Sequence, residues 1–373
     1  MLTPEQISGL QVAASRITDP VNDYLLRDIA SRIREAGELT STSAYELYRS
    51  QLLGADLRKV KQDLARLLKT TQADAEALLN QAAEFGYNLD VKRLPGLVPF
   101  RENAEVQQIV SAAVKMAGDE LQNMTRTEAI MMYDPAGNVK PLAEAYTACT
   151  DFAFSQVITG ATDYNTAVRQ ACDGIVKHGV GVSYASGVNT SLEAAVRRNI
   201  MGGLGLMVEQ VEQSNHDALG CNGWEISAHA NSAPDHEPIQ GKQYSDADYE
   251  ALNGSLLRRI GTLNCGHVAF PIIIGVNRPQ YTPEELSKFR KDNADGVTVD
   301  GEHYTGYQAT QRQRAMERSI RRQKRRITMA APDDEEAARA KLELMTQKYN
   351  QFSKAAKLRT EDERLFVSGF KIS

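Results

Sequence analysis

The chain has 373 residues, of which 42% are apolar and 24% are charged, and its 43 Lys and Arg against 48 Asp and Glu leave a formal net charge of -5. These values are typical of a globular protein with a buried core and exclude a disordered or fibrous chain. They give no global electrostatic reason for nucleic-acid binding, so any such role must be local. At roughly 150 residues per domain, the length predicts two or three domains.

Cysteine use and the N-terminus indicate the setting in which the chain folds. The four cysteines, Cys149, Cys172, Cys221 and Cys265, are spread thinly, which is typical of a reduced fold, and we expect no disulfide. The first residues carry neither a basic segment nor an apolar one, so we expect no signal peptide. The longest apolar stretch, residues 268–276, contains Pro271 and is far shorter than the roughly 20 residues of a transmembrane helix. We therefore expect no membrane partner.

The first 130 or so residues are predicted to be mostly helical. Apolar residues recur at helical spacing over residues 19–37, where Asp19 is placed as the N-cap and Pro20 at the first helical position. Similar periodicity predicts helices over residues 44–68, 72–85 and 103–132, with the main break at 94–99. The apolar faces of such helices pack in a core or dock onto a partner.

The middle of the chain mixes helical and strand patterns. A turn is predicted at residues 134–137, helices at 142–158, 164–178 and 191–212, and strands at 180–184 and 224–229. Alternation in the last strand places Glu225, Ser227 and His229 on one polar face. Ser245 and Thr282 have the surroundings of helix N-caps, the second with a capping box. The middle is therefore predicted to be α+β.

From about Tyr304 the sequence is again helical and its charges are segregated. Eight cations face a single Glu317 over residues 312–326: Arg312, Arg314, Arg318, Arg321, Arg322, Lys324, Arg325 and Arg326. Arginines on one helix can follow a phosphate backbone, which predicts salt-dependent DNA binding. The alternative is a solvated or acid-paired face, for which residues 333–336 offer acidic side chains.

Four potential metal ligands lie in the central region. Cys265 and His267 are two residues apart, as on one face of a strand, and a loop carrying His229 and His236 could complete a nitrogen and sulfur set. Such a set suits a structural zinc ion. The spacings differ from the usual zinc pattern, however, and the alternative is a buried hydrogen-bond network that joins a loop to a strand.

Several segments together resemble the minor capsid protein 2 family of tailed bacteriophages. They are NDYLLRDIASRI (22–33), YASG (184–187), AVRR (195–198), WEISAH (224–229), PDH (234–236), QGK (240–242), NCGH (264–267), PIIIG (271–275), QRQRAMERSIRRQKRR (311–326) and RLFVSGF (364–370). The family is related to the Mu F-like head morphogenesis proteins, in which the equivalent segment often resembles a Cys and His metal cluster. That resemblance favours His236, Cys265 and His267 as ligands. The chain departs from the family at Gly266, where Arg is usual.

The sequence thus predicts a predominantly helical α+β fold in three regions: a helical docking region over residues 1–133, a small α+β module with the His and Cys cluster over 134–302, and a basic C-terminal helical region over 303–373. The resemblance implies a non-enzymatic minor capsid protein inside the phage head near the portal, present in the host cytoplasm during assembly. Its expected partners are the portal protein, other capsid proteins and packaged double-stranded DNA, and its expected roles are head assembly or DNA ejection.

Two other functions remain open from the sequence. The first is a metal-dependent enzyme acting on nucleic acid through His229, His236, Cys265 and His267, with Glu225 or Asp235 as the general base. The second is a DNA-binding module alone, whose affinity would fall steeply with salt.

Overall fold

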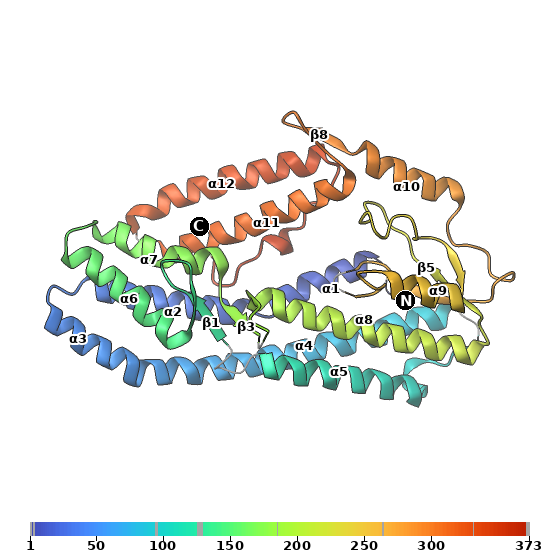
Figure 1. Ribbon diagram of the computed structural model, residues 1–373, viewed down its shortest axis with the longest axis horizontal. Helices are drawn as coiled ribbons and strands as arrows, with labels where there is room; N and C mark the ends of the chain where they lie inside the picture. The colour runs from blue at the N-terminus through green and yellow to red at the C-terminus, as the bar shows by residue number, and fades with distance from the viewer. Residues whose placement is uncertain are drawn as a thin grey trace.

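The chain folds into an elongated, predominantly helical α+β structure in this computed structural model, which confirms the predicted fold class (Figure 1). The structure describes residues 2, 4–93, 96–124, 130–184, 186–262, 265–330 and 332–370. Four predicted features include residues outside this set. They are the break at 94–99, the helix at 103–132 through residues 125–129, and the 184–187 and 264–267 segments through Ala185 and Asn264. No helix in the described part of the chain is both long and apolar enough to span a membrane.

Long helices form most of the N-terminal third. They are α1 (Pro4–Arg16), α2 (Asp19–Gly37), α3 (Thr42–Gln51), a π-helical turn (Leu52–Asp56), α4 (Leu57–Arg93), a 3-10 turn (Phe100–Glu102) and α5 (Ala104–Met124). The bounds of α2 are those predicted, and its apolar face is buried. Thr18 rather than Asp19 occupies the N-cap, because Asp19 already belongs to the first helical turn.

The helix predicted over residues 103–132 is wrong at its C-terminal end. Helix α5 ends at Met124, and strand β1 covers Ile130–Tyr133. Ile130 and Met132 alternate with partly exposed neighbours, which is strand periodicity, and pairing with Val182 of β3 (Gly181–Ser183) fixes them in a sheet. A short apolar stretch fits both the helical and the strand period, so pairing with another strand decides which structure forms.

The central region contains two small antiparallel sheets. The first has the order β2-β1-β3-β4, with β2 at Val139–Pro141 and β4 at Asn189–Ser191, and the second has the order β6-β5-β7, with strands Gln243–Ser245, Gly223–Ile226 and Ala269–Ile272. The helices between them are α6 (Leu142–Ile158), α7 (Tyr164–His178), α8 (Leu192–Leu219), α9 (Asp246–Ser255) and α10 (Pro283–Asp295). Ser245 and Thr282 cap α9 and α10 as predicted.

The C-terminal region is a helical pair. A hairpin of β8 (Val297–Val299) and β9 (Glu302–Tyr304) precedes α11 (Gly306–Met329) and α12 (Pro332–Ala355), and a 3-10 turn, η3 (Asp362–Leu365), follows. Figure 1 shows α11 lying between α12 and the N-terminal helices. Arg34 of α2 donates to the carbonyl of Met329 at 2.6 Å. Helix α11 is therefore an inner element of the fold.

One large apolar core joins most of these elements. It includes Leu2, residues of α2 and α4 to α8, strands β1 and β3, and Met329 at the end of α11. Smaller clusters surround Trp224 and Ile226 in the second sheet and Ile320 with Tyr349 between α11 and α12. The large core thus contains residues from both sides of the boundary predicted at residue 133. The three-region division stays a prediction.

Two glycines let α8 approach its neighbours closely. A Cβ on Gly203 would lie 3.0 Å from the Cβ of Ala117 in α5, and a Cβ on Gly205 would collide with the carbonyl oxygen of Gly261. Gly202, which directly precedes Gly203, has no atom within 4 Å of the position where a Cβ would lie. The glycine-rich run of α8 therefore serves packing between backbones.

This difference gives a matched pair of variants. We expect Gly205→Ala to lower the free energy of unfolding by at least about 1–3 kcal/mol, because the new methyl group overlaps backbone that cannot rotate away. Gly202→Ala adds the same methyl group in open space and should raise the free energy of unfolding by up to about 1 kcal/mol, since alanine favours a helix interior. Denaturant unfolding of the full chain measures both. Equal effects of the two substitutions would contradict the close packing.

Candidate functional site

The second sheet carries the predicted metal ligands on the loops beside its strands. His236 lies in a turn where its backbone N–H donates to Ala233, and Cys265 and His267 precede β7. The strand predicted over residues 224–229 is shorter than expected, because β5 ends at Ile226. Ser227 continues irregular pairing, with its N–H donating to the carbonyl of Val268 at 2.8 Å. The predicted polar face is not solvated, since Glu225 and Ser227 are both buried.

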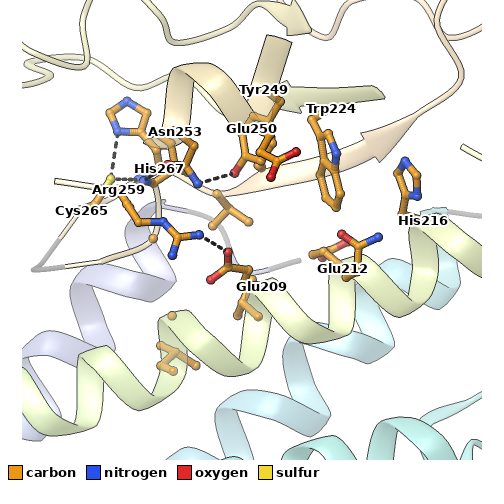
Figure 2. Close-up of a pocket in the computed structure, with 18 of the residues that line it drawn as sticks. Glu209, Glu212, His216, Trp224, Tyr249, Glu250, Asn253, Arg259, Cys265 and His267 are labelled. Carbon is orange, nitrogen blue, oxygen red and sulfur yellow. Dashed lines mark hydrogen bonds and ion pairs between the residues drawn. The ribbon is translucent and has the colours of Figure 1, made fainter. Parts of the chain in front are cut away.

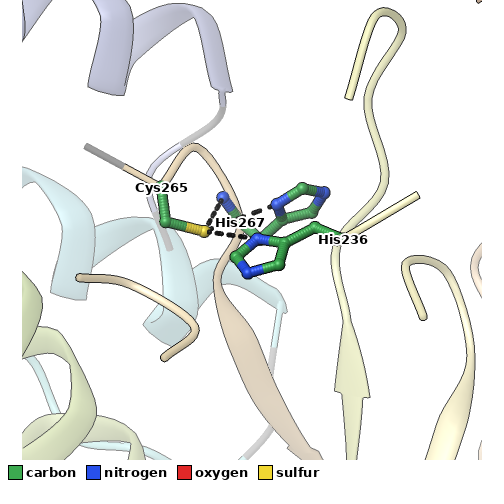
Figure 3. Close-up of side chains that lie close together, drawn as sticks. All are labelled: His236, Cys265 and His267. Carbon is green, nitrogen blue, oxygen red and sulfur yellow. Dashed lines mark hydrogen bonds between the residues drawn. The ribbon is translucent and has the colours of Figure 1, made fainter. Parts of the chain in front are cut away.

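His236, Cys265 and His267 meet in one buried cluster (Figure 3). The sulfur of Cys265 lies 3.3 Å from Nδ1 of His236 and 3.4 Å from Nδ1 of His267. The ligand atoms of the three residues all lie within 4.8 Å of one another. A tetrahedral zinc ion with ordinary bond lengths would separate sulfur from nitrogen by roughly 3.6 Å. The cluster therefore has the donor types and spacing of a zinc site and supplies three of the four ligands of a tetrahedral ion.

The outer nitrogens of both imidazoles face hydrogen-bond acceptors. Nε2 of His236 lies 2.8 Å from the carbonyl oxygen of Arg258, and Nε2 of His267 lies 3.0 Å from Oε1 of Gln240. Gln240 Oε1 also accepts from the backbone N–H of His229, which assigns it as oxygen. Both Nε2 atoms thus carry the proton, and both Nδ1 lone pairs point to the sulfur. Metal-binding histidines are held in this way by their outer-shell partners.

The protonation of the cluster also fits a metal site. Burial, together with the neighbouring His229 and His236, lowers the pKa of His267 to about 2, so its ring is neutral and able to coordinate. Burial raises the pKa of the Cys265 thiol, so in the absence of a cation the sulfur keeps its proton. One thiol proton can serve only one of the two Nδ1 lone pairs, whereas a metal ion would engage both and release that proton.

His229, the fourth predicted ligand, lies beside this cluster and outside the set of three. Its Nδ1 is 2.9 Å from the carbonyl oxygen of Ala230, and its ring centroid is 4.3 Å from that of His267. A Cβ at Gly266 would lie 3.1 Å from His229 Nε2. The missing side chain at residue 266 therefore leaves the space that the His229 ring occupies.

A pocket of about 740 Å³ opens between α8 and the second sheet (Figure 2). Cys265 and His267 line it on one side. On the other side the Trp224 ring stacks between the rings of His216 and Tyr249, with centroid distances of 5.0 Å and 5.3 Å. The sequence analysis missed this stack because the three residues belong to different elements. The single tryptophan of the chain, placed in a strand, was the only signal pointing to it.

The two carboxylates considered as general bases are both engaged by other groups. Glu225 accepts from Nε2 of Gln243 at 2.9 Å and from the backbone N–H of Gln280 at 2.8 Å. Asp235 accepts two hydrogen bonds from the guanidinium of Arg258, which lowers the pKa of its carboxyl group. Asp235 Oδ2 also lies 3.8 Å from Nε2 of His236.

Most of the eight predicted DNA-binding cations of α11 point into the protein. Arg321 and Arg325 pair with Glu193 at 2.9 Å and 3.5 Å, and Arg326 pairs with Asp173 at 2.5 Å. Arg314 donates to Glu317 and Arg322 to Ser319 within the helix, and Lys324 donates to the carbonyl of Leu365 in the C-terminal segment. Arg312 and Arg318 are the exposed members of the set.

Among the side chains that the structure describes, the carboxylates that pair with α11 do not come from the acidic run after it. Asp334 lies 3.6 Å from Arg169 of α7, and Glu335 pairs with Arg339 within α12. Glu193 of α8 and Asp173 of α7 supply the carboxylates instead. The pairing is therefore tertiary and could not be inferred from neighbouring sequence.

Comparison with known proteins gives a match over nearly the whole chain. A family model described as phage minor capsid protein 2 matches residues 2–354. No curated protein and no solved structure matches the chain. The matched region includes the metal-type cluster, the pocket and all of α11, and by this match the chain belongs to the phage minor capsid protein 2 family, a family of virion structural proteins.

Proposed function

We propose that this minor capsid protein lies inside the phage head at the portal vertex, where it contacts packaged double-stranded DNA and assists head assembly or DNA ejection. The observation that carries the proposal is the family match over residues 2–354. Other capsid proteins and the portal are the expected partners, and the host cytoplasm is the expected location before assembly.

Exposed apolar side chains on the N-terminal helices support docking to a protein partner. Leu47 of α3, Leu53 of the π-helical turn, Phe85 of α4 and Met116 of α5 are all exposed, although these helices also bury a continuous core. In Figure 1, α3, α4 and α5 run along one long side of the molecule. Burying a large apolar side chain at an interface contributes roughly 1.5–3 kcal/mol, so this side can supply the contacts that a portal partner needs.

DNA contact is proposed for the exposed part of α11 alone. Arg312 and Arg318 are exposed, whereas Arg321 and Arg325 are held in largely buried ion pairs with Glu193 and Arg326 is held in an exposed pair with Asp173. Contacts of this kind neutralise phosphates without reading sequence. They fit a protein that meets packaged DNA of any sequence.

For the His236, Cys265 and His267 cluster, we propose a structural zinc ion. All three side chains are buried and their outer nitrogens are fixed, which favours a rigid junction between loop and strand. A metal-dependent enzyme acting on nucleic acid is the second candidate, favoured by the pocket that Cys265 and His267 line. Glu225 and Asp235, the general bases considered for that enzyme, are each hydrogen-bonded to other groups.

The docking proposal predicts the effect of removing the exposed apolar groups. The full-length triple variant Leu47→Ser, Phe85→Ser, Met116→Ser should bind the portal protein of the same phage at least tenfold more weakly than the native chain. The full-length variant Leu344→Ser, which changes an exposed leucine on α12, is the control and should bind normally. Surface-immobilised portal and titrated capsid protein give both affinities. Unchanged binding by the triple variant would remove the N-terminal helices as the docking surface.

The DNA proposal predicts a change in salt dependence. The double variant Arg312→Ala, Arg318→Ala should reduce the slope of log affinity against log salt by about 2, because each lost phosphate contact removes about 0.9. Arg326→Ala, which breaks a pair with Asp173, should leave that slope unchanged. Fluorescence anisotropy with a duplex at several salt concentrations measures it. Binding that is absent, or independent of salt, would contradict DNA contact.

The zinc proposal predicts about one zinc ion per chain in protein purified without chelator. Cys265→Ser should lower zinc affinity by more than the roughly 10- to 100-fold cost of losing an outer-shell partner. His229→Ala should retain the ion, since His229 lies outside the ligand set. Metal analysis and the thiolate absorption of a cobalt-substituted sample report binding directly. Chelator-sensitive cleavage of nucleic acid, lost in His236→Ala, would instead establish the enzyme.

A further inference from the structure

A second cavity, unrelated to the His and Cys cluster, lies where both ends of the chain meet the start of α8. Its volume is about 410 Å³. The walls come from α1 and α2, the N-terminal turn of α8, the middle of α11 and the segment around η3. The lining of this cavity is strongly basic.

Nine lysine and arginine side chains line this cavity against four carboxylates. Three of those carboxylates already have cationic partners: Glu193 takes Arg321 and Arg325, and Glu317 takes Arg314, while Glu363 lies 4.0 Å from Arg16. Burial raises the pKa of the fourth, Asp19, to about 7, which reduces its negative charge near neutral pH. The cavity therefore holds a clear excess of positive charge.

Arg197 of α8 shows the excess most directly. Its Nε atom is buried and has no hydrogen-bond partner among the described residues. Burial lowers the pKa of Arg197, and Arg318 and Arg321 lower it further against the opposing effect of Glu193. A buried N–H donor without an acceptor is costly, and an anion in the cavity would supply one.

Positive charges also lie close together at Arg314, another residue that lines the cavity. Burial lowers the pKa of Arg314, and the nearby Arg364 lowers it further. Arg364 is itself fixed, because it donates to Ser8 Oγ at 2.6 Å and its carbonyl accepts from Arg321 at 2.7 Å. These guanidinium groups are thus held in place before any ligand arrives. Planar guanidinium groups match the oxygens of phosphate in paired hydrogen bonds.

We propose that this cavity binds a small multivalent phosphate anion, such as pyrophosphate or the phosphate chain of a nucleotide, with Arg197 as the central contact. The anion would join α8 and α11 to the C-terminal segment, where the guanidinium of Arg16 stacks over the Phe366 ring at 4.2 Å. A small anion fits better than a duplex, because Arg321, Arg325 and Arg364 are largely buried within the recess. The proposal is independent of the portal and DNA assignments.

The test uses the full chain and titrates pyrophosphate at low salt by calorimetry. We expect the native chain to bind, and its melting temperature to rise with added pyrophosphate. Arg197→Gln should weaken binding at least tenfold. Arg198→Gln, the adjacent exposed arginine on the same helix, is the matched control and should bind within about twofold of the native chain. ATP titrated in parallel identifies whether a nucleotide or a free phosphate chain is preferred.

The stability of Arg197→Gln is measured as well, so that a loss of binding is not confused with a loss of folding. Because the Arg197 Nε atom has no partner, Arg197→Gln should fold and should melt no lower than the native chain when no anion is present. Arg322→Gln removes a second, partly exposed cation of the lining and should also weaken binding. The proposal is overturned if neither pyrophosphate nor ATP binds the native chain, or if Arg198→Gln loses as much affinity as Arg197→Gln. Binding of duplex DNA alone, weakened tenfold by Arg197→Gln, overturns it equally.

Discussion

The close packing of α8 determines where the other features of the molecule lie. Gly203 and Gly205 let this helix approach α5 and the Gly261 backbone without an intervening side chain. Its C-terminal half then presents Glu209 and His216 to the pocket beside the second sheet, and its first turns present Glu193 and Arg197 to the basic cavity. A rigid helix has a fixed rise per residue, so the number of residues between Arg197 and His216 sets the spacing of these two sites along α8.

Part of this arrangement could be predicted from the sequence, and the reason is local. Residues 19–37 carry an uninterrupted apolar period, and α2 has those bounds. Thr282 and Glu285 form the predicted capping box, since both partners lie within one turn. Residues 130–132 were misassigned because a short apolar run satisfies both helical and strand periods. Only pairing with β3, about 50 residues later in the chain, decides between them.

The metal-type cluster could also be predicted only in part from the sequence. Residue types and spacing were enough to nominate Cys265 and His267 together with His236, and the fold brings these three together. Spacing could not exclude His229, which lies close to the others but turns its Nδ1 to the neighbouring Ala230 carbonyl. Nor could it reveal that Arg258 and Gln240 fix the imidazoles. Outer-shell partners come from other loops and leave no local pattern.

The basic helix α11 demonstrates why a charge pattern alone does not define a surface. Eight cations in one stretch suggest an outward face, yet Arg321 and Arg325 meet Glu193 of α8, which lies more than a hundred residues earlier. Those two cations hold α11 against the body of the fold, and Arg318 and Arg322 line the same cavity. Buried ion pairs add little net stability but are costly to break. Arginine density in α11 therefore reflects how the C-terminal helices are fixed, and the exposed Arg312 and Arg318 remain for contacts outside the chain.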